Sequence, residues 1–258
     1  RSMRDPASAR PARGFRARLR RAQERWSDQL LTVLTILLVV LFFVAVPLQA
    51  SGAEPAQILG GLVLLGIIAG ALVLSGSPWV FAALSVGLLM NASAVVMRLS
   101  TPSKTDIVLA AGGWLILALV LGSVVARLVF GPGRVTTHRV IGAVLLYLLV
   151  AAAFVAVFAV VGMAIPNAFA GLEVVDSPGL AANLIYFSFV TLTSTGYGDI
   201  APVHPIARAL CNIETIIGQL YPATLLARLV TLELEHRRER VAGRDASRGE
   251  HPGRVRKE

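Results

Sequence analysis

Cysteine and charge are both scarce in this chain of 258 residues. Its single cysteine, Cys211, excludes an intrachain disulfide and a metal site built from several cysteines. Charged residues make up 15% of the chain and hydrophobic residues 55%, whereas a soluble domain carries roughly 25% charge. No nucleotide-binding glycine loop, zinc signature or nucleophile elbow occurs, so nothing indicates an enzyme, a cofactor or a nucleic-acid partner. The composition predicts an all-α integral membrane protein.

Six apolar segments are long enough to cross a bilayer, which takes about 20 residues of helix. They are 30–48, 58–74, 80–97, 107–130, 140–165 and 206–232. The connections between them carry turn residues, as in "SGSP" and "FGPGR". The sequence therefore predicts six transmembrane helices. We expect a four-helix domain over residues 29–130 and a second module over residues 131–235.

The lysines and arginines predict the orientation of these spans. They are concentrated in the amino-terminal stretch, in the 127–139 connection and at the carboxyl end, and only Arg98 and Lys104 argue the other way. By the positive-inside rule both termini are cytoplasmic in a multi-pass protein of the cell membrane. The alternative for the first span is a cleaved signal peptide. The apolar region of a signal peptide usually has about 7–15 residues, and that of the first span is longer.

Residues 1–28 form an arginine-rich arm that precedes the first span. Phe15, Leu19, Ala22 and Trp26 recur in it at helical spacing among the arginines. This pattern is typical of an amphipathic helix lying on anionic lipids of the cytoplasmic leaflet, and a solvated basic arm is the alternative. Residues 236–258 are predicted to be a short polar cytoplasmic tail.

A short apolar helix is expected after residue 176. Asp176 or Ser177 can cap it and Pro178 suits its first position, but the apolar run that follows is too short to span the bilayer. We therefore expect a re-entrant helix. Non-helical backbone at membrane depth is tolerated only where it is buried in protein or lines a water-filled path, so the residues after this helix must line something.

The segment "TLTSTGYGDI" follows this helix. A row of carbonyls aimed at one axis requires alternate residues in left-handed conformations, and Gly196 and Gly198 are two apart. Four such loops make rings of oxygens that replace the hydration shell of a monovalent cation. Tyr197 would point away from the axis, toward Tyr186 and Phe187. Ser194 would add a ring of hydroxyls, and Asp199 would lie at the outer mouth.

"VTLTSTGYGDIAP" resembles the signature of the potassium-channel family. The resemblance implies a homotetrameric, potassium-selective channel with a pore module over residues 131–235 and K⁺ as its permeant ion. It implies that the following residues form the K⁺-binding filter: Ser194, Thr195, Gly196, Tyr197 and Gly198. Two positions depart from the family pattern. Ser194 replaces threonine, and Thr195 replaces valine or isoleucine and so needs a hydrogen-bond partner.

The sixth span is expected to be the inner helix of this pore. The resemblance makes Gly218 a hinge, and Pro222 removes one helical hydrogen bond and kinks the helix. One helical stripe is predicted to line the cavity: Thr215, Gln219, Pro222, Leu226 and Val230. Glu214 is a carboxylate near mid-membrane and therefore a functional candidate. It either bonds hydroxyls behind the filter, at Thr191, Thr193 or Thr195, or presents a ring of charge to the cavity.

The first four spans lack the arginine ladder that voltage-gated channels carry on their fourth span. Arg127 is the only basic residue of the fourth span and lies at its end. The sequence therefore predicts a channel that is not strongly voltage-gated, and it leaves the gating stimulus open. Thr195 motivates an alternative, a weakly selective cation channel. The unfamiliar first four spans motivate another, a carrier or a non-conducting accessory subunit.

Overall fold

The computed structural model describes residues 29–52, 54–75, 77–100, 104–131, 137–175, 177 and 179–249. The arginine-rich arm, the proposed cap Asp176, the proposed first helical residue Pro178, and residues 250–258 lie outside the described residues. The amphipathic arm therefore stays a prediction.

The described chain is almost entirely helical. Its first helix, Gln29–Ala50, contains the π-helical turn η1 (Leu41–Ala45) and ends as α2 (Val46–Ala50). The elements that follow are α3 (Glu54–Ser75), α4 (Pro78–Ser100), α5 (Lys104–Phe130), α6 (Thr137–Ala164), β1 (Phe169–Ala170), α7 (Leu180–Leu192), β2 (Ala201–Pro202) and α8 (Pro205–Gly249). The two short strands pair antiparallel, with Phe169 opposite Pro202.

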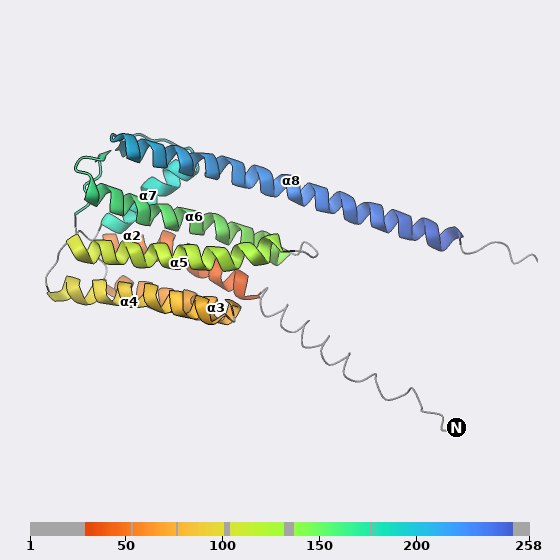
Figure 1. The fold of residues 1–258 in the computed structure, drawn as a ribbon, viewed down its shortest axis with the longest axis horizontal. Helices are drawn as coiled ribbons and strands as arrows, with labels where there is room; N and C mark the ends of the chain where they lie inside the picture. Colours follow the sequence, from red (N-terminus) through yellow and green to blue (C-terminus); the bar gives the residue numbers. More distant parts are fainter. Residues whose placement is uncertain are drawn as a thin grey trace, which may run out of the picture.

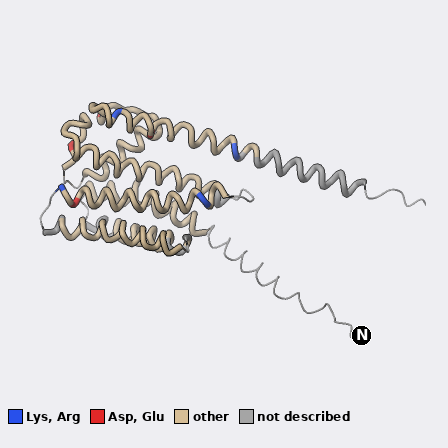
Figure 2. Tube along the Cα trace, in the orientation of Figure 1, with Lys and Arg blue, Asp and Glu red and all other residues tan. Residues whose placement is uncertain are grey.

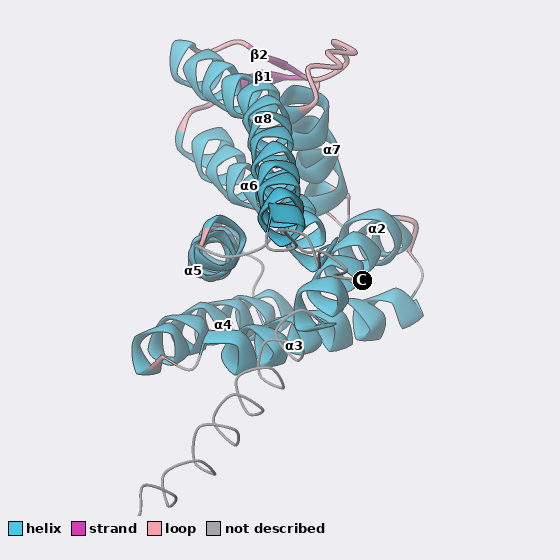
Figure 3. Cartoon of the chain, turned by 90° about the vertical axis from the view of Figure 1, so that its right-hand side faces the viewer, coloured by secondary structure: helices cyan, strands magenta, loops and turns pink. Residues whose placement is uncertain are grey.

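The long helices run along one direction and form layers (Figure 1). Helices α3 and α4 lie on one side, α6, α7 and α8 lie on the other, and α5 lies between the two groups (Figure 3). The start of the first helix and the carboxyl end of α8 point to the same end of the molecule. The expectation that both termini are cytoplasmic stays a prediction, because the termini themselves lie outside the described residues.

Four of the described helices are long and apolar enough to cross a membrane: Gln29–Ala50, Pro78–Met97, Lys104–Phe130 and Val140–Ala164. The apolar stretches Leu59–Ala71 and Leu180–Leu192 are shorter. Four of the six expected spans thus have helices of the required length and polarity, and the second and sixth spans remain predictions. Charged residues of the described chain lie mainly at the ends of the helices (Figure 2).

Helix α8 continues past the predicted end of the sixth span. It runs without interruption to Gly249, so most of the predicted polar tail is helical. Residues 232–249 are rich in Leu, Glu, Arg and Ala, which favour helix, and the next proline is Pro252. In Figure 1 this half of α8 extends well beyond the other helices.

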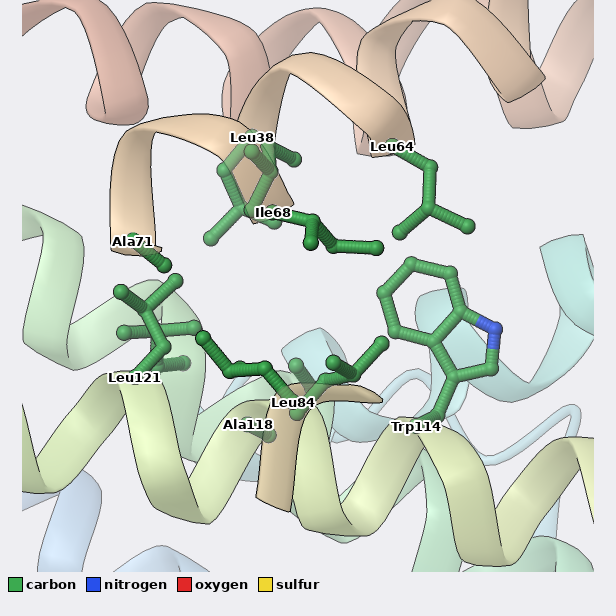
Figure 4. Close-up of a pocket in the computed structure, with 12 residues that line it drawn as sticks. Leu38, Leu64, Ile68, Ala71, Leu84, Trp114, Ala118 and Leu121 are labelled. Atoms are coloured by element: carbon green, nitrogen blue, oxygen red, sulfur yellow. The ribbon is translucent and has the colours of Figure 1, made fainter. Parts of the chain in front are cut away.

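The first helix, α3, α4 and α5, which we call the front helices, share an apolar core that includes a small cavity. Leu31, Leu34 and Leu38 of the first helix are each at most 2% exposed. The cavity measures about 20 Å³ and lies between the first helix, α3, α4, α5 and α6 (Figure 4). Its lining includes Leu38 and Trp114 and offers almost no polar atoms, so a water molecule there would lack partners.

Candidate ion-conduction site

Helix α7 lies against both α6 and α8 and carries the predicted filter segment, residues 194–198, at its carboxyl end (Figure 3). The helix begins later than the sequence predicts. Its N-cap is Gly179, without a side-chain hydrogen bond, rather than Asp176 or Ser177. The reason is a turn before the helix, in which the Leu180 amide donates to the Ser177 carbonyl.

The backbone of the filter segment alternates between two conformations. Ser194, Gly196 and Gly198 have positive φ angles of 58°, 62° and 85°, whereas the residues between them do not. The alternation that the two glycines predict is therefore present, and it also includes Ser194. Successive carbonyls of such a backbone can face the same side, which suits the coordination of a dehydrated cation. Residues 193–199 are exposed in the single chain, so this face is open to a partner or an ion path.

Two hydrogen bonds join the start of this segment to α7. The Ser194 amide donates to the Thr191 carbonyl at 3.0 Å, and the Thr195 amide donates to the Val190 carbonyl at 2.9 Å. A Cβ added to Gly196 or Gly198 would meet no atom of the same chain within 4 Å. Glycine is therefore required there by the left-handed backbone, not by lack of space.

Tyr197 packs against Tyr186 as the sequence predicts. The two rings are stacked, with centroids 6.2 Å apart and planes 4° apart. The Tyr186 hydroxyl also faces the carboxylate of Asp199. The expected contact of Tyr197 with Phe187 is not part of this arrangement: Phe187 turns to the protein interior, with its ring 5.0 Å from Phe158 and 5.3 Å from Phe169.

The first half of α8 packs directly on the end of α7. A Cβ added to Gly218 would collide with the carbonyl oxygen of Leu192. One turn earlier the Thr215 hydroxyl donates to the Thr191 carbonyl at 3.2 Å. Beside Gly218, the Gln219 amide donates to the Ser194 hydroxyl at 2.9 Å. The family resemblance predicts that Gly218 is a hinge. The geometry shows that glycine is needed at this position because the backbones of α7 and α8 approach closely there.

A comparison with protein-family models agrees with this geometry. Residues 143–234, which run from α6 to the middle of α8, match the family described as "Ion channel". We refer to this matched segment, residues 143–234, as the ion channel domain. The match points to ion transport rather than to enzymatic catalysis, and it is consistent with the resemblance to potassium channels. No curated protein and no solved structure matches the chain.

Within the ion channel domain, the hydroxyl of Thr195 has the partner that the sequence requires. Its Oγ1 lies 2.8 Å from Oγ1 of Thr193, and the Thr193 hydroxyl donates to the Phe189 carbonyl at 2.7 Å. Since the Thr193 proton is used in that bond, Thr195 is the donor to Thr193. The polar residue that replaces valine or isoleucine is thereby tied to α7.

Glu214 is fully buried and faces α7. Its Oε1 lies 2.5 Å from the Ser188 hydroxyl, which also lies 3.1 Å from the Ala151 carbonyl of α6. Among the described residues, Oε2 of Glu214 has no hydrogen-bond partner. The hydroxyl partner is thus Ser188 rather than Thr191, Thr193 or Thr195. The alternative prediction, a ring of charge that faces the cavity, does not fit this position. Helices α6 and α7 of the same chain enclose the Glu214 carboxyl group.

The other predicted cavity residues lie on the open side of α8. Gln219, Pro222, Leu226 and Val230 are exposed in the single chain, while Thr215 is half-buried against α7. Leu226 is 64% exposed and Val230 51% exposed, so these apolar side chains are available to an aqueous cavity or a neighbouring chain.

Sequence reasoning missed two groups of contacts that hold this domain. Gly171, with φ of 76°, lies against the backbone of Asp199, where an added Cβ would collide with the Asp199 carbonyl. The only signal was an isolated glycine in the loop before α7. At the other end, Arg228 of α8 donates to the Phe130 carbonyl at 3.1 Å and lies 5.0 Å above the Phe130 ring. This contact joins α8 to the carboxyl end of α5, where a cation is favourable.

Proposed function

We propose that the chain is one subunit of a homotetrameric, potassium-selective channel. The observation that carries the proposal is the alternating left-handed backbone at Ser194, Gly196 and Gly198, placed at the end of a short helix between α6 and α8. Four such segments around one axis provide rings of carbonyl oxygens that replace the hydration shell of K⁺. The five residues from Ser194 to Gly198 hold the ion, and no resident cofactor takes part.

The tetramer follows from what one chain supplies. One chain contributes one filter strand, so closing a ring requires several copies. The open face of each chain carries Tyr197, 71% exposed, and a row of exposed apolar residues on α8, among them Ile216 and Leu220. Burial of this face against neighbouring copies is favourable because it removes apolar surface from a water-filled path.

In the proposed topology six helices cross the membrane and α7 re-enters from outside. Helix α3 and the first half of α8 supply the second and sixth crossings, and both termini are cytoplasmic. The channel is not strongly voltage-gated, since the described charges of the front helices lie at their ends: Lys104 and Asp106 at one, Arg127 at the other (Figure 2). The arginine-rich arm binds anionic lipids of the cytoplasmic leaflet.

Reconstitution in liposomes under opposing K⁺ and Na⁺ gradients tests the proposal. A reversal potential near the potassium equilibrium value is the expected result. A reversal potential near zero would favour the weakly selective cation channel that Thr195 motivates. Absence of unitary current would favour a carrier or an accessory subunit. Four-fold symmetric particles in detergent would count against the carrier independently.

A further inference from the structure

The helix α8 reaches the innermost residue of the filter segment through one polar side chain. The Gln219 amide donates to the Ser194 hydroxyl at 2.9 Å, across a sequence separation of 25 residues. Gln219 is exposed in the single chain, so its side chain lies on the face that the proposed pore axis would occupy. The Ser194 hydroxyl is the group that would contribute the innermost oxygen of the filter.

The place of Gln219 is fixed by its neighbours on α8. Gly218 abuts the Leu192 carbonyl, and the Thr215 hydroxyl bonds the Thr191 carbonyl. These two contacts lock the register of α8 against the last turn of α7. Gln219 is the next residue of α8 after Gly218. The fixed register therefore places its side-chain amide at Ser194.

Ser194 needs such a contact more than a threonine would. A β-branched side chain is stiff at χ1, whereas serine has no γ-methyl group to restrict its rotamer. Ser194 also has a positive φ of 58°, a conformation that non-glycine residues rarely adopt. A hydroxyl oxygen has two lone pairs. With one of them occupied by the Gln219 amide, the other has a defined direction and can face a cation.

We propose that Gln219 is a positioning residue for the innermost cation site, and that its amide holds the Ser194 hydroxyl in the ligating orientation. This inference rests on the proposed function and adds to it the part played by the inner helix. Gln219 thus does more than line a cavity. It compensates for the serine that stands where the potassium-channel pattern has a threonine.

The test measures how strongly a divalent cation blocks the K⁺ current in planar bilayers. It compares four proteins: wild type, Gln219→Met, Ser194→Thr and the double variant. Ba²⁺, a divalent cation of about the size of K⁺, is the probe and is added to each side in turn. Methionine keeps the length of the side chain and removes the donor. We expect Gln219→Met to weaken block by about three- to tenfold, the range of one neutral hydrogen bond. Adding Ser194→Thr should restore block to within about twofold, because the methyl group then restricts the rotamer.

Thr224→Val is the matched control on α8. The Thr224 hydroxyl bonds only carbonyls of its own helix in the described structure, at 2.8 and 3.0 Å, so its loss should leave block unchanged. Equal block in Gln219→Met and Thr224→Val would overturn the inference, and so would a double variant as weak as Gln219→Met alone. In both cases the wild type would still be potassium-selective, whereas a wild type without K⁺ current would overturn the proposed function itself.

A second measurement covers the case in which Gln219→Met does not conduct. K⁺ that binds one site of the folded protein at concentration c stabilises it by RT ln(1 + c/Kd), so its melting temperature rises with the K⁺ concentration relative to Kd. Gln219→Asn retains an amide but is one methylene too short to reach Ser194. For both Gln219 variants we expect the K⁺ concentration that gives a fixed rise in melting temperature to be about threefold or more higher than for the wild type, as for the loss of one hydrogen bond. Unchanged K⁺ dependence in both variants would overturn the inference.

Discussion

The ion channel domain and the four front helices are held together in different ways. In the ion channel domain, polar side chains bond the backbone of other elements, as Tyr221 does with the Ala143 carbonyl at 2.9 Å and Thr215 with the Thr191 carbonyl at 3.2 Å. In the front helices, Asn91, Ser123 and Thr35 bond carbonyls of their own helix, and leucine, isoleucine and alanine side chains fill most of the contacts. Only the Thr35 hydroxyl, among the bonds described there, also reaches another element, at 3.5 Å from the Ile141 carbonyl.

The difference reflects what each region must fix. Apolar side chains pack with little directional preference, and in a bilayer the lipid is as apolar as the protein. Such packing can hold a collar of helices, here the front helices, together. It does not fix the position of any single atom closely. A hydrogen bond has a defined length and direction. The contacts of Thr215, Gln219 and Thr193 therefore collect where the backbone of residues 194–198 has to be held.

The largest expected effect breaks the close packing of the ion channel domain. Gly218→Ala places a methyl group against the Leu192 carbonyl, and overpacking of this kind costs about 1–3 kcal/mol or more in each chain. We expect loss of the proposed tetramer or of selective current, measured by size-exclusion chromatography and reversal potential. Gly61→Ala in α3 is the control, because its Cβ would meet nothing within 4 Å and alanine favours helix. If Gly218→Ala changed the open probability and kept normal selectivity, the result would instead support the hinge role that the family resemblance implies.

Gly198→Ala should have the next largest effect. Its φ of 85° is a left-handed conformation that costs a side-chain-bearing residue roughly 1–2 kcal/mol, and in the proposed ring the change occurs once per subunit. We expect loss of K⁺ over Na⁺ selectivity in bi-ionic reversal measurements. Gly179→Ala is the matched control, since Gly179 has a negative φ and free space around it. Normal selectivity in Gly198→Ala would show that this residue is not part of the filter.

A smaller effect is expected at Glu214, which links α8 to α7 through Ser188. Glu214→Ala leaves a cavity and removes one of the two hydrogen-bond partners of the Ser188 hydroxyl, so we expect a loss of about 1–3 kcal/mol of stability, seen as a lower melting temperature in detergent. Glu214→Gln keeps the oxygen that bonds Ser188 and should retain both fold and conduction. If the glutamine variant were as damaged as the alanine variant, the charge of the carboxylate rather than its hydrogen bond would be the essential property.

The sequence predicts the parts of this molecule that depend on local chemistry. Apolar length marks the helices, the spacing of Gly196 and Gly198 marks the alternating backbone, and the aromatic residue between them marks the contact with Tyr186. What it does not predict depends on residues far apart in the chain. Nothing local distinguishes a glycine that bends, as expected of Gly218, from a glycine that lies against another backbone.

The same limit explains the partner of Glu214. The sequence leaves two roles open for this carboxylate: a bond to Thr191, Thr193 or Thr195 behind the filter, or a ring of charge in the cavity. The structure instead pairs it with Ser188, one turn earlier on α7, because the relative height of α7 and α8 is set by Gly218 and Leu192. A shift of one helical turn cannot be read from either helix alone.

The smallest expected effect concerns voltage. It tests whether the front helices act only as a packing collar and take no part in gating. Moving one charge through the membrane field supplies about 2.3 kcal/mol per 100 mV, so steep voltage gating requires several charges that move within the field. In the described part of the front helices Lys104, Asp106 and Arg127 lie at helix ends, and buried leucines fill the middle. Glu214 is enclosed between α6, α7 and α8 and is not on a separate mobile element. We expect open probability to change little between about −100 and +100 mV in single-channel recordings, with an effective valence below about one. An effective valence of about two or more would mean that a charged element of the front helices moves through the field, and it would end their description as a collar.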